Sequence, residues 1–207
     1  MADSLWSDTA QSLLERTASA DPTPGGGSVG MLAGSFGLGL VLMALEVTCK
    51  RKDAPAGIDA LLEEGRPLLE AARRSVDADV EVFEAFMAAM RLPKASDDEK
   101  ALRRAAMQEA TVKATEVPLE AAGLCASGLE LAERAARSAH TNILSDVAAG
   151  VMLLSAAGRA VLRNVDANLG SLKDEGLCAR YSDERSRRES ELRAREAAVL
   201  GGIESRQ

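Results

Sequence analysis

Apolar residues recur at helical spacing along nearly the whole chain, so the sequence predicts a protein made of helices. Leu5, Leu13 and Leu14, with polar residues between them, predict a first helix from about residue 4 to 18. The segment "DPTPGGG" that follows ends this helix, because proline breaks a helix and glycine permits dihedral angles that other residues avoid.

A second helix is expected from about Ser28 to Lys50, with Ser28 as its N-terminal cap. It carries no charge from Val29 to Leu45, and no other segment of the chain resembles a membrane span. A bilayer span needs about twenty apolar residues, so a membrane helix stays open as an alternative. We favour the central, buried helix of a soluble bundle, which is also apolar all round.

Two further helices follow from the pattern. A long helix is predicted over residues 57–90, and Gly65 and Pro67 mark a candidate break within it. Ser96 and Glu99 match a capping box, which predicts that the next helix begins directly after Ser96.

The C-terminal half of the chain continues in the same way. Pro118 is expected to kink or divide its helical stretch. A mostly apolar helix is predicted over residues 142–170. The charged tail, residues 182–207, is expected to be helical with a thin apolar stripe that includes Leu192 and Val199.

The predicted fold class is all-α, a helical bundle in a single domain over residues 1–207. The apolar helices at 28–50 and 142–170 are expected at the centre, with the amphipathic helices outside them. Aromatic residues make up only 2% of the chain, so the core must consist of Leu, Val, Met and Ala. Such side chains bury little area each, which favours further burial between copies of the chain.

Charge and cysteine spacing argue against two classes of function. A net charge of -7 gives no support to nucleic-acid binding, which needs a basic surface. Cys49, Cys125 and Cys178 lack CxxC spacing and His140 is the only histidine, so no zinc site is recognisable. Reduced, buried thiols fit a cytoplasmic protein, and the acidic, amphipathic N-terminus does not resemble a signal peptide.

The glycine loop has two interpretations that the residues leave open. Gly25, Gly26 and Gly27 precede a helix, whose unpaired N–H groups and positive dipole end suit a phosphate, a carboxylate or developing negative charge. No Gly-Lys-Ser/Thr follows, so the loop is not a P-loop. A tight turn in which only glycine fits explains it equally well.

Asp79 is a candidate for proton transfer. Asp79 and Phe83 are one helical turn apart on one face, whereas Asp77 lies on a different face. Asp79 therefore borders the apolar side of its helix. Burial on such a side often raises the pKa of a carboxyl group, which suits it to proton transfer. The alternative is a solvated acid, which is what most aspartates on helices are.

Polar pairs stand at both ends of the apolar helix at 142–170. Asn142 and Asp146 are four residues apart, as are Asn164 and Asn168, so each pair shares a face. A ligand, solvent or another subunit would supply their hydrogen-bond partners. The first pair also fits plain helix capping. His140 is interpreted as structural rather than as a proton shuttle.

Several motifs occur in a specific order along the chain: "PTPGGGSVG", "DADVEVF", "LPK" with "DDEKALRRAAMQEA", "EVPLEAA", "TNILSDV" and "RNVDANL". In this order they resemble the formiminotetrahydrofolate cyclodeaminase and methenyltetrahydrofolate cyclohydrolase family. The resemblance implies an all-helical homodimer that binds folate in a cleft at the dimer interface. It implies no metal or redox cofactor, and no nucleic-acid or membrane partner.

The resemblance also implies roles for individual residues. Asp79 would be the acid/base or cation-stabilising carboxylate, and Lys94 and Asp146 would also handle protons. Lys50 and Lys52 would contact the glutamate carboxylates of folate. The full set implied for substrate binding is Pro24, Gly25, Gly26, Gly27, Ser28, Lys50, Lys52, Asn142, Asn164 and Asn168.

Three activities are compatible with this resemblance. The leading one is the cyclodeaminase, in which N10 attacks the formimino carbon on N5 and ammonia leaves. The second is the cyclohydrolase, in which water opens methenyltetrahydrofolate to 10-formyltetrahydrofolate. The third is a folate-binding helical dimer without catalysis. It is suggested by three departures from the family's pattern: "CKRKD" after the second helix, His140 and Glu46.

Overall fold

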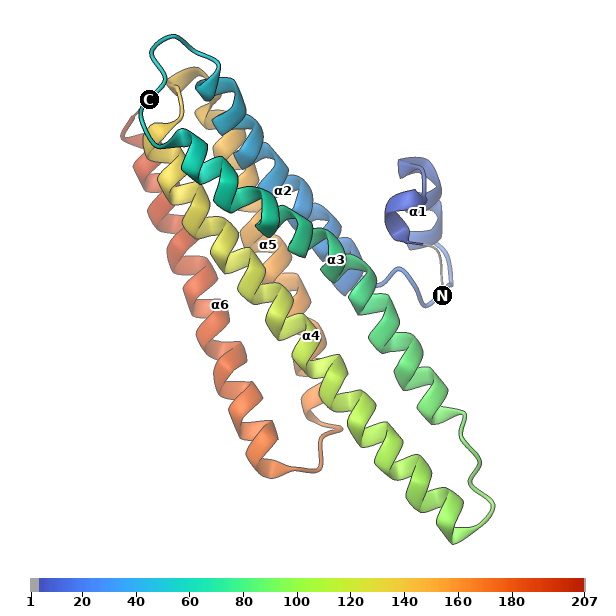
Figure 1. Cartoon of the computed structure of the whole chain (residues 1–207). Coiled ribbons are helices and arrows are strands. Elements are labelled where there is room, and N and C mark those ends of the chain that lie inside the picture. The colour runs from blue at the N-terminus through green and yellow to red at the C-terminus, as the bar shows by residue number, and fades with distance from the viewer. Residues whose placement is uncertain (1–3, 207) are drawn as a thin grey trace.

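A computed structural model describes residues 4–206 of the chain, and within this range the only regular elements are helices (Figure 1). The prediction of an all-α bundle is confirmed for these residues. Two short 3-10 helices accompany the α-helices. The order is η1 (Leu5–Ser7), α1 (Ala10–Thr17), α2 (Gly26–Cys49), α3 (Ile58–Met90), α4 (Asp97–Ser138), η2 (Thr141–Ile143), α5 (Leu144–Leu169) and α6 (Glu175–Glu204).

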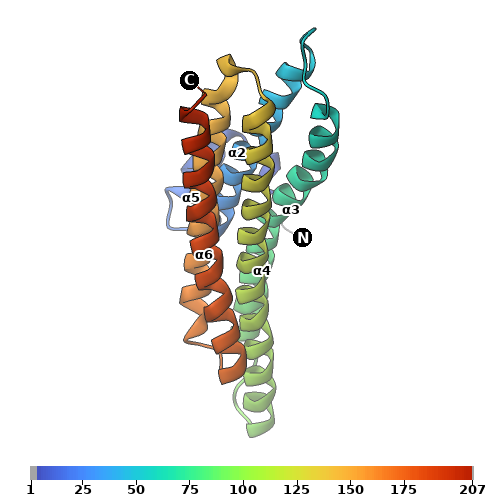
Figure 2. The ribbon, with the colours of Figure 1, turned by 90° about the vertical axis from the view of Figure 1, so that its left-hand side faces the viewer.

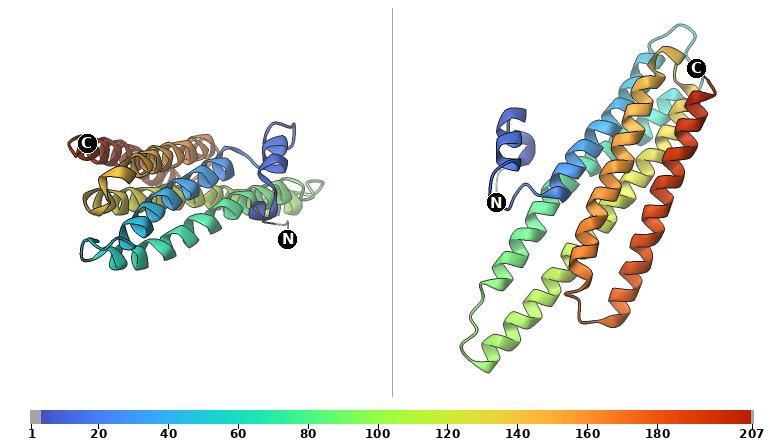
Figure 3. Two further views of the ribbon diagram at one scale, coloured as in Figure 1. Left: turned by 90° about the horizontal axis from the view of Figure 1, so that it is seen from above. Right: turned by 180° about the vertical axis from the view of Figure 1, so that it is seen from behind.

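The single helix expected from residue 4 to 18 is wrong, because η1 and α1 divide this segment. Asp8 is extended, and the Thr9 side chain accepts a hydrogen bond from the backbone N–H of Ser12, which starts a new helix. The Asp77 carboxylate of α3 accepts hydrogen bonds from the Ser4 hydroxyl (2.6 Å) and the Leu5 N–H (2.9 Å). These bonds fix η1 on α3, while α1 stands apart from the bundle (Figure 3).

The bundle is built from α2, α3, α4 and α5, with α6 in the groove between α4 and α5 (Figure 2). The prediction that the two apolar helices pack together is confirmed, since α2 packs along α5. They are not enclosed at the centre, because Phe36 of α2 is 64% exposed and Met152 of α5 is 51% exposed. The expectation that the other helices lie outside is wrong for the C-terminal half of α4. Between Pro118 and Ala136 this half contributes buried residues on nearly every turn.

Glycine lets the two central helices touch through their backbones. A β-carbon at Gly37 would lie 2.8 Å from the carbonyl oxygen of Gly150, and one at Gly150 would lie 2.5 Å from that of Gly37. No larger residue fits at either position without separating α2 from α5. Gly37 of α2 and Gly150 of α5 are therefore required by the close packing of these two helices.

Prolines do not interrupt the long helices. Pro67 lies inside the continuous helix α3 and Pro118 inside the continuous helix α4, so the expected break or division at these residues is absent. The capping box of Ser96 and Glu99 is confirmed at the start of α4. In α6, Leu192 and Val199 are buried as expected, together with Tyr181 and Ile203.

Two segments, Gly26–Cys49 and Thr141–Leu169, are long and apolar enough to cross a membrane by length and composition alone. The sequence-based statement that only the first resembles a span is therefore wrong. These two segments pack on each other in the bundle, and 61% and 44% of their most apolar windows are buried there. A core helix of a soluble protein meets the same criterion.

The ion pairs of Glu189, on α6, predict how the free energy of unfolding depends on pH. A hydrogen bond from Arg193, together with the charges of Arg185 and Arg163, holds the pKa of Glu189 below its ordinary value of 4.5. A carboxyl whose pKa is lower in the folded state stabilises the fold above its unfolded pKa, and this contribution is lost as the pH falls through the folded pKa.

We therefore expect the free energy of unfolding to decrease as the pH falls below about 4.5, and to decrease less in Glu189→Gln. Urea unfolding of both proteins between about pH 6 and pH 3 measures this difference. Glu63→Gln is the control, because Glu63 is exposed and forms no ion pair within residues 4–206. An acid sensitivity equal in Glu189→Gln and the unmodified protein would contradict the prediction.

Candidate active site

Asp79 joins three helices at one end of α2. Its Oδ2 accepts hydrogen bonds from the backbone N–H (2.9 Å) and the hydroxyl (2.7 Å) of Ser28 on α2. Its Oδ1 accepts a hydrogen bond from Nδ2 of Asn164 on α5 (3.1 Å). Ser28 is therefore not the N-terminal cap that the sequence predicted. Gly25 occupies the cap position. The Asp79 carboxylate of α3 accepts a hydrogen bond from the Ser28 N–H, which has no partner within the first turn of α2.

Gly27 is required by this arrangement. A β-carbon at Gly27 would lie 2.0 Å from Oδ1 of Asp79 and 2.5 Å from Nδ2 of Asn164, which is too close for any real contact. A β-carbon at Gly26 would meet no atom within 4 Å, and one at Gly25 only the carbonyl oxygen of Pro22 at 3.8 Å. Of the two interpretations of the glycine loop, close packing therefore explains Gly27, whereas it does not explain Gly25 and Gly26.

Gly25 and Gly26 border a cavity of about 280 Å³. Its polar groups are Asp79, Asn164 and Asn168, and its apolar wall includes Phe83 and Phe86. The complete lining is Pro22, Thr23, Gly25, Gly26, Asp79, Val82, Phe83, Phe86, Ala114, Asn164, Ala167 and Asn168. A half-buried carboxylate, two amides and two aromatic rings thus converge beside an exposed turn of backbone.

Asn168 is held by a hydrogen bond that depends on Pro118. Its Nδ2 donates to the carbonyl oxygen of Ala114 (2.8 Å). In an uninterrupted helix this carbonyl accepts from the N–H four residues later, but that residue is Pro118, which has no N–H. The side chain of α5 therefore replaces the missing backbone donor of α4.

Phe83 was predicted to share a face with Asp79, whereas Phe86 was not among the predicted residues. Asp79, Phe83 and Phe86 follow one another at spacings of four and three, so they occupy one face of α3. Two of the three phenylalanines in the chain lie on this face. In a chain with so few aromatic residues, that spacing was the available signal.

Five of the residues implied by the resemblance lie away from this cavity in the same chain. Lys94 is exposed in the loop between α3 and α4, about 17 Å along α3 beyond Asp79. Lys50 and Lys52 follow the other end of α2, about 36 Å from Gly26. Asn142 in η2 and Asp146 in the first turn of α5 are at this other end as well.

The departures from the family pattern have structural partners. Nδ1 of His140 accepts a hydrogen bond from the backbone N–H of Asn142 (3.2 Å), which supports its structural interpretation. Glu46 forms an ion pair with Arg66. Neither residue lines the Asp79 cavity. Within residues 4–206, no three His, Cys, Asp or Glu side chains are grouped to hold a metal ion.

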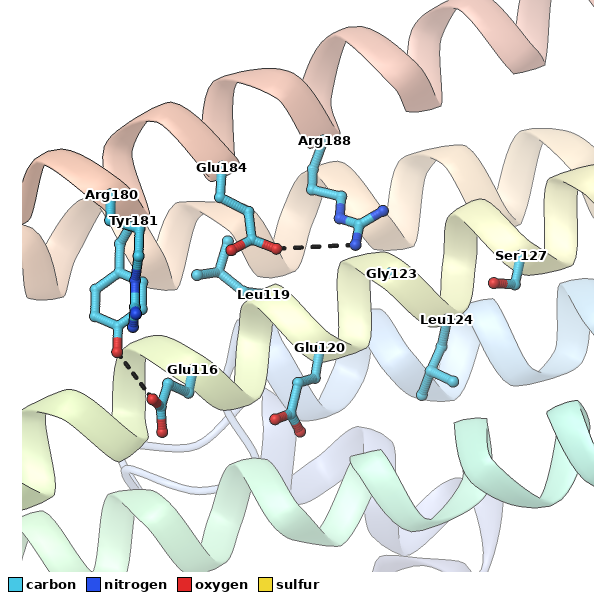
Figure 4. Close-up of a pocket in the computed structure, with 10 residues that line it drawn as sticks. All are labelled: Glu116, Leu119, Glu120, Gly123, Leu124, Ser127, Arg180, Tyr181, Glu184 and Arg188. Atoms are coloured by element: carbon cyan, nitrogen blue, oxygen red, sulfur yellow. Dashed lines mark hydrogen bonds and ion pairs between the residues drawn. The ribbon is translucent and has the colours of Figure 1, made fainter. Parts of the chain in front are cut away.

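A second hollow, of about 560 Å³, lies between α4 and α6 (Figure 4). Two pairs of its lining side chains are in contact. The Tyr181 hydroxyl donates to Glu116 (2.9 Å), and Arg188 lies 3.8 Å from Glu184. Hydrogen bonds from Lys113 and Tyr181 lower the pKa of Glu116, and burial raises the pKa of Tyr181. This hollow is larger, and its charged lining is only partly paired: within residues 4–206 Glu120 and Arg180 form no ion pair, and the buried Nε of Arg188 has no hydrogen-bond partner.

Comparison with known proteins agrees with the motifs. A sequence profile described as formiminotransferase-cyclodeaminase matches residues 9–187. The chain belongs to the formiminotransferase-cyclodeaminase family. A member of this family from Methylorubrum extorquens, named methenyltetrahydrofolate cyclohydrolase, is 35% identical over 173 residues, which are 82% of this chain and 83% of that protein.

Two other relatives carry the cyclodeaminase name. The formimidoyltransferase-cyclodeaminase of Sus scrofa is 29% identical over 99% of this chain, which corresponds to 38% of the length of that protein. The crystal structure of a formiminotetrahydrofolate cyclodeaminase from Thermotoga maritima superposes with a TM-score of 0.84 at 23% identity. The match covers 97% of this chain and 98% of that one. At this identity the structural likeness establishes the fold.

The glycine positions give a direct test of the Asp79 contacts. We expect Gly27→Ala to lower the free energy of unfolding by about 1–3 kcal/mol, because the new methyl group displaces Asp79 and Asn164. Gly26→Ala should leave stability unchanged or slightly raised, since its methyl group meets no atom. Urea unfolding compares the two variants, and equal stabilities would show that the Asp79 contacts do not need Gly27.

Proposed function

We propose that this protein is an enzyme that acts on the one-carbon unit joining N5 and N10 of tetrahydrofolate. The observation that carries the proposal is the cavity beside Gly25 and Gly26, where Asp79 and two asparagines face two aromatic rings. Membership of the formiminotransferase-cyclodeaminase family supports the same assignment. The proposed substrate is a tetrahydrofolate derivative, and the reaction as proposed needs no metal or redox cofactor.

The lining of the cavity suits a flat, polar ring system. Phe83 and Phe86 line the cavity, and aromatic rings can stack against a pterin. Asn164 and Asn168 use their NH₂ groups within the protein. Among residues 4–206 no hydrogen bond reaches the Oδ1 of either, so both oxygens are available to accept from a ligand. The exposed backbone of Gly25 and Gly26 allows a ligand to approach closely.

Asp79 is proposed to stabilise positive charge during the reaction. Three donors fix its carboxylate, so its position does not depend on the ligand. The methenyl group and the intermediates on either side of it carry an amidinium-like positive charge, which a fixed carboxylate stabilises without rearrangement. Asp79 also borders the cavity closely enough to exchange a proton with water or with a substrate nitrogen.

Of the two reactions, we place the cyclohydrolase first. Water adds to the methenyl carbon and loses a proton, the bond from this carbon to N5 breaks, and N5 takes up a proton to give 10-formyltetrahydrofolate. The Methylorubrum extorquens relative supports this order, because it bears the cyclohydrolase name and aligns over 83% of its own length. The cyclodeaminase, which the resemblance alone put first, is the second candidate, and the names of the Sus scrofa and Thermotoga maritima proteins support it.

We also propose a homodimer located in the cytoplasm, without nucleic-acid or membrane partners, as the resemblance implies. The other residues that the resemblance implies are retained as ligand or proton-handling groups within this proposal: Lys94, Asp146, Pro24, Lys50, Lys52 and Asn142. A folate-binding dimer without catalysis stays the alternative if no turnover is found.

Absorbance of the methenyltetrahydrofolate chromophore separates these activities. Loss of absorbance from methenyltetrahydrofolate above the uncatalysed rate identifies the cyclohydrolase. Appearance of absorbance from 5-formiminotetrahydrofolate identifies the cyclodeaminase. If neither rate exceeds the background, the proposal of an enzyme is overturned, and equilibrium binding of tetrahydrofolate then tests the non-catalytic alternative.

Asp79→Asn is expected to lower kcat about 100-fold or more, because it removes the charge while keeping the shape of the side chain. Asp77→Asn is a matched control: Asp77 also accepts a serine hydroxyl and a backbone N–H, but it lies outside the Asp79 cavity. It should retain turnover within a few-fold. Urea unfolding checks that both variants fold, and an unchanged kcat in Asp79→Asn would remove this residue from the mechanism.

A further inference from the structure

The side-chain amide of Asn168 faces α4 in one orientation. Its Nδ2 donates to the carbonyl oxygen of Ala114 at 2.8 Å. Turning the amide by half a rotation would put its Oδ1 in this place, where two acceptor oxygens would repel each other. The contact therefore selects the orientation in which Nδ2 faces α4 and Oδ1 faces away from Ala114.

This selection depends on Pro118. In a continuous helix the N–H of residue 118 would reach the carbonyl of Ala114, but proline has no N–H. With any other residue at this position a backbone N–H would hold the carbonyl, and Asn168 would gain less by facing it. Pro118 is buried in the middle of α4, so the usual role of proline at the start of a helix does not explain it.

The backbone that carries Asn168 is fixed separately. Gln108 of α4 donates from its Nε2 to the carbonyl oxygen of Ser171 (2.9 Å) and accepts at its Oε1 from the N–H of Lys173 (2.9 Å). The N–H of Ser171 in turn donates to the carbonyl oxygen of Asn168 (2.9 Å). The end of α5 is therefore held on α4 without the Asn168 side chain, and Pro118 decides which way the amide faces rather than where its backbone lies.

Asn164, one turn earlier on α5, is oriented in the same sense by a different partner. Its Nδ2 donates to Oδ1 of Asp79 (3.1 Å). Both amides therefore use a nitrogen within the protein, and within residues 4–206 no hydrogen bond reaches the Oδ1 of either. Together with the Asp79 carboxylate, three side chains bring oxygen acceptors to one cavity. Such a lining favours a ligand that carries N–H donors.

A pterin ring offers both kinds of group. Its 2-amino group, N3 and N8 carry N–H donors, whereas N1 and O4 are acceptors. An amide held in one orientation accepts from a donor at its Oδ1 and leaves an acceptor in that place unpaired, which is costly in a partly buried site. An amide that is free to turn would pair with either. The orientation of Asn168 therefore affects which ligand the cavity selects.

We propose that Pro118 is a positioning residue of this site: it keeps the Asn168 amide turned toward α4, so that Oδ1 of Asn168 selects an N–H donor of the pterin ring. Pro118 does not line the cavity and acts through Asn168. The identity of the ligand rests on the proposed function, whereas the orientation of the amide does not.

Hydrogen exchange of the side-chain amides tests the orientation without any ligand. NMR spectroscopy follows the Asn168 NH₂ group, which is assigned by its absence in Asn168→Ser. In the unmodified protein it should exchange about tenfold or more slowly than the NH₂ group of the exposed Asn142. In Pro118→Ala its exchange should become about threefold to tenfold faster. Equal exchange at Asn168 and Asn142, or no change in Pro118→Ala, would overturn the proposal.

Steady-state kinetics separate positioning from catalysis. Pro118→Ala should raise KM about threefold to tenfold and leave kcat within about twofold, because a contact to the pterin is lost equally from the bound substrate and from the transition state. Urea unfolding checks that the variant folds. A lower kcat with an unchanged KM, or no change in either, would show that Pro118 does not position a binding group.

Pro67→Ala is the matched control. Pro67 also lies inside a continuous helix, α3, but it is exposed and about 18 Å along this helix from Asp79. The substitution adds a backbone N–H there as well, so it reproduces the general effect of removing a proline from a helix. KM, kcat and the exchange of the Asn168 amide should stay as in the unmodified protein. Equal changes in the two variants would contradict a specific role of Pro118.

Ligand analogues test the selectivity itself. Equilibrium binding compares tetrahydrofolate with its 2-desamino-2-methyl, N3-methyl and 8-deaza analogues, each of which lacks an N–H group of the ring. At least one analogue should bind to the unmodified protein about tenfold or more weakly than tetrahydrofolate, and this difference should shrink to about threefold or less in Pro118→Ala. If the unmodified protein discriminates against none of them, or if Pro118→Ala weakens all four ligands by one factor, the proposal is wrong.

Failure of the proposed function looks different. In that case the unmodified protein neither binds tetrahydrofolate nor turns over its derivatives. The exchange rates of the Asn168 amide still report whether Pro118 orients it.

Discussion

The carboxylate of Asp79 is the constraint on which this site depends. It accepts hydrogen bonds from Ser28 at the start of α2 and from Asn164 near the end of α5. Three helices are therefore joined at its two oxygen atoms. Only glycine fits at position 27, because Asp79 and Asn164 occupy the space that a side chain would need. Gly25 and Gly26, directly before this contact, line the cavity. The hydrogen bonds that fix the start of α2 therefore also hold this backbone where a ligand can reach it.

Much of the fold follows from local patterns. The boundaries of α3, the start of α4 at the capping box of Ser96 and the buried stripe of α6 were predictable, because each depends on residues a turn or two apart. The division between η1 and α1 was not, because Asp77, more than seventy residues away, fixes η1.

The candidate site was predictable as a set of residues but not as an arrangement. Asp79, Asn164 and Asn168 were named from the motifs, yet their partners lie on other helices, and no spacing along the chain reveals these contacts. Lys50 and Lys52 illustrate the opposite case. Their charge was conspicuous in the sequence, but the chain holds them at the far end of α2, away from the Asp79 cavity.

Pro118 makes the hydrogen bonding of one helix depend on another helix. A proline within α4 leaves the carbonyl of Ala114 without a donor, and Asn168 of α5 supplies it. Without α5, only water could donate to this carbonyl, so the middle of α4 receives this protein hydrogen bond from the packing of α5. At this point α4 depends on a hydrogen bond from another helix. Because Asn168 also lines the Asp79 cavity, the shape of the cavity and the packing of α4 on α5 depend on the same side chain.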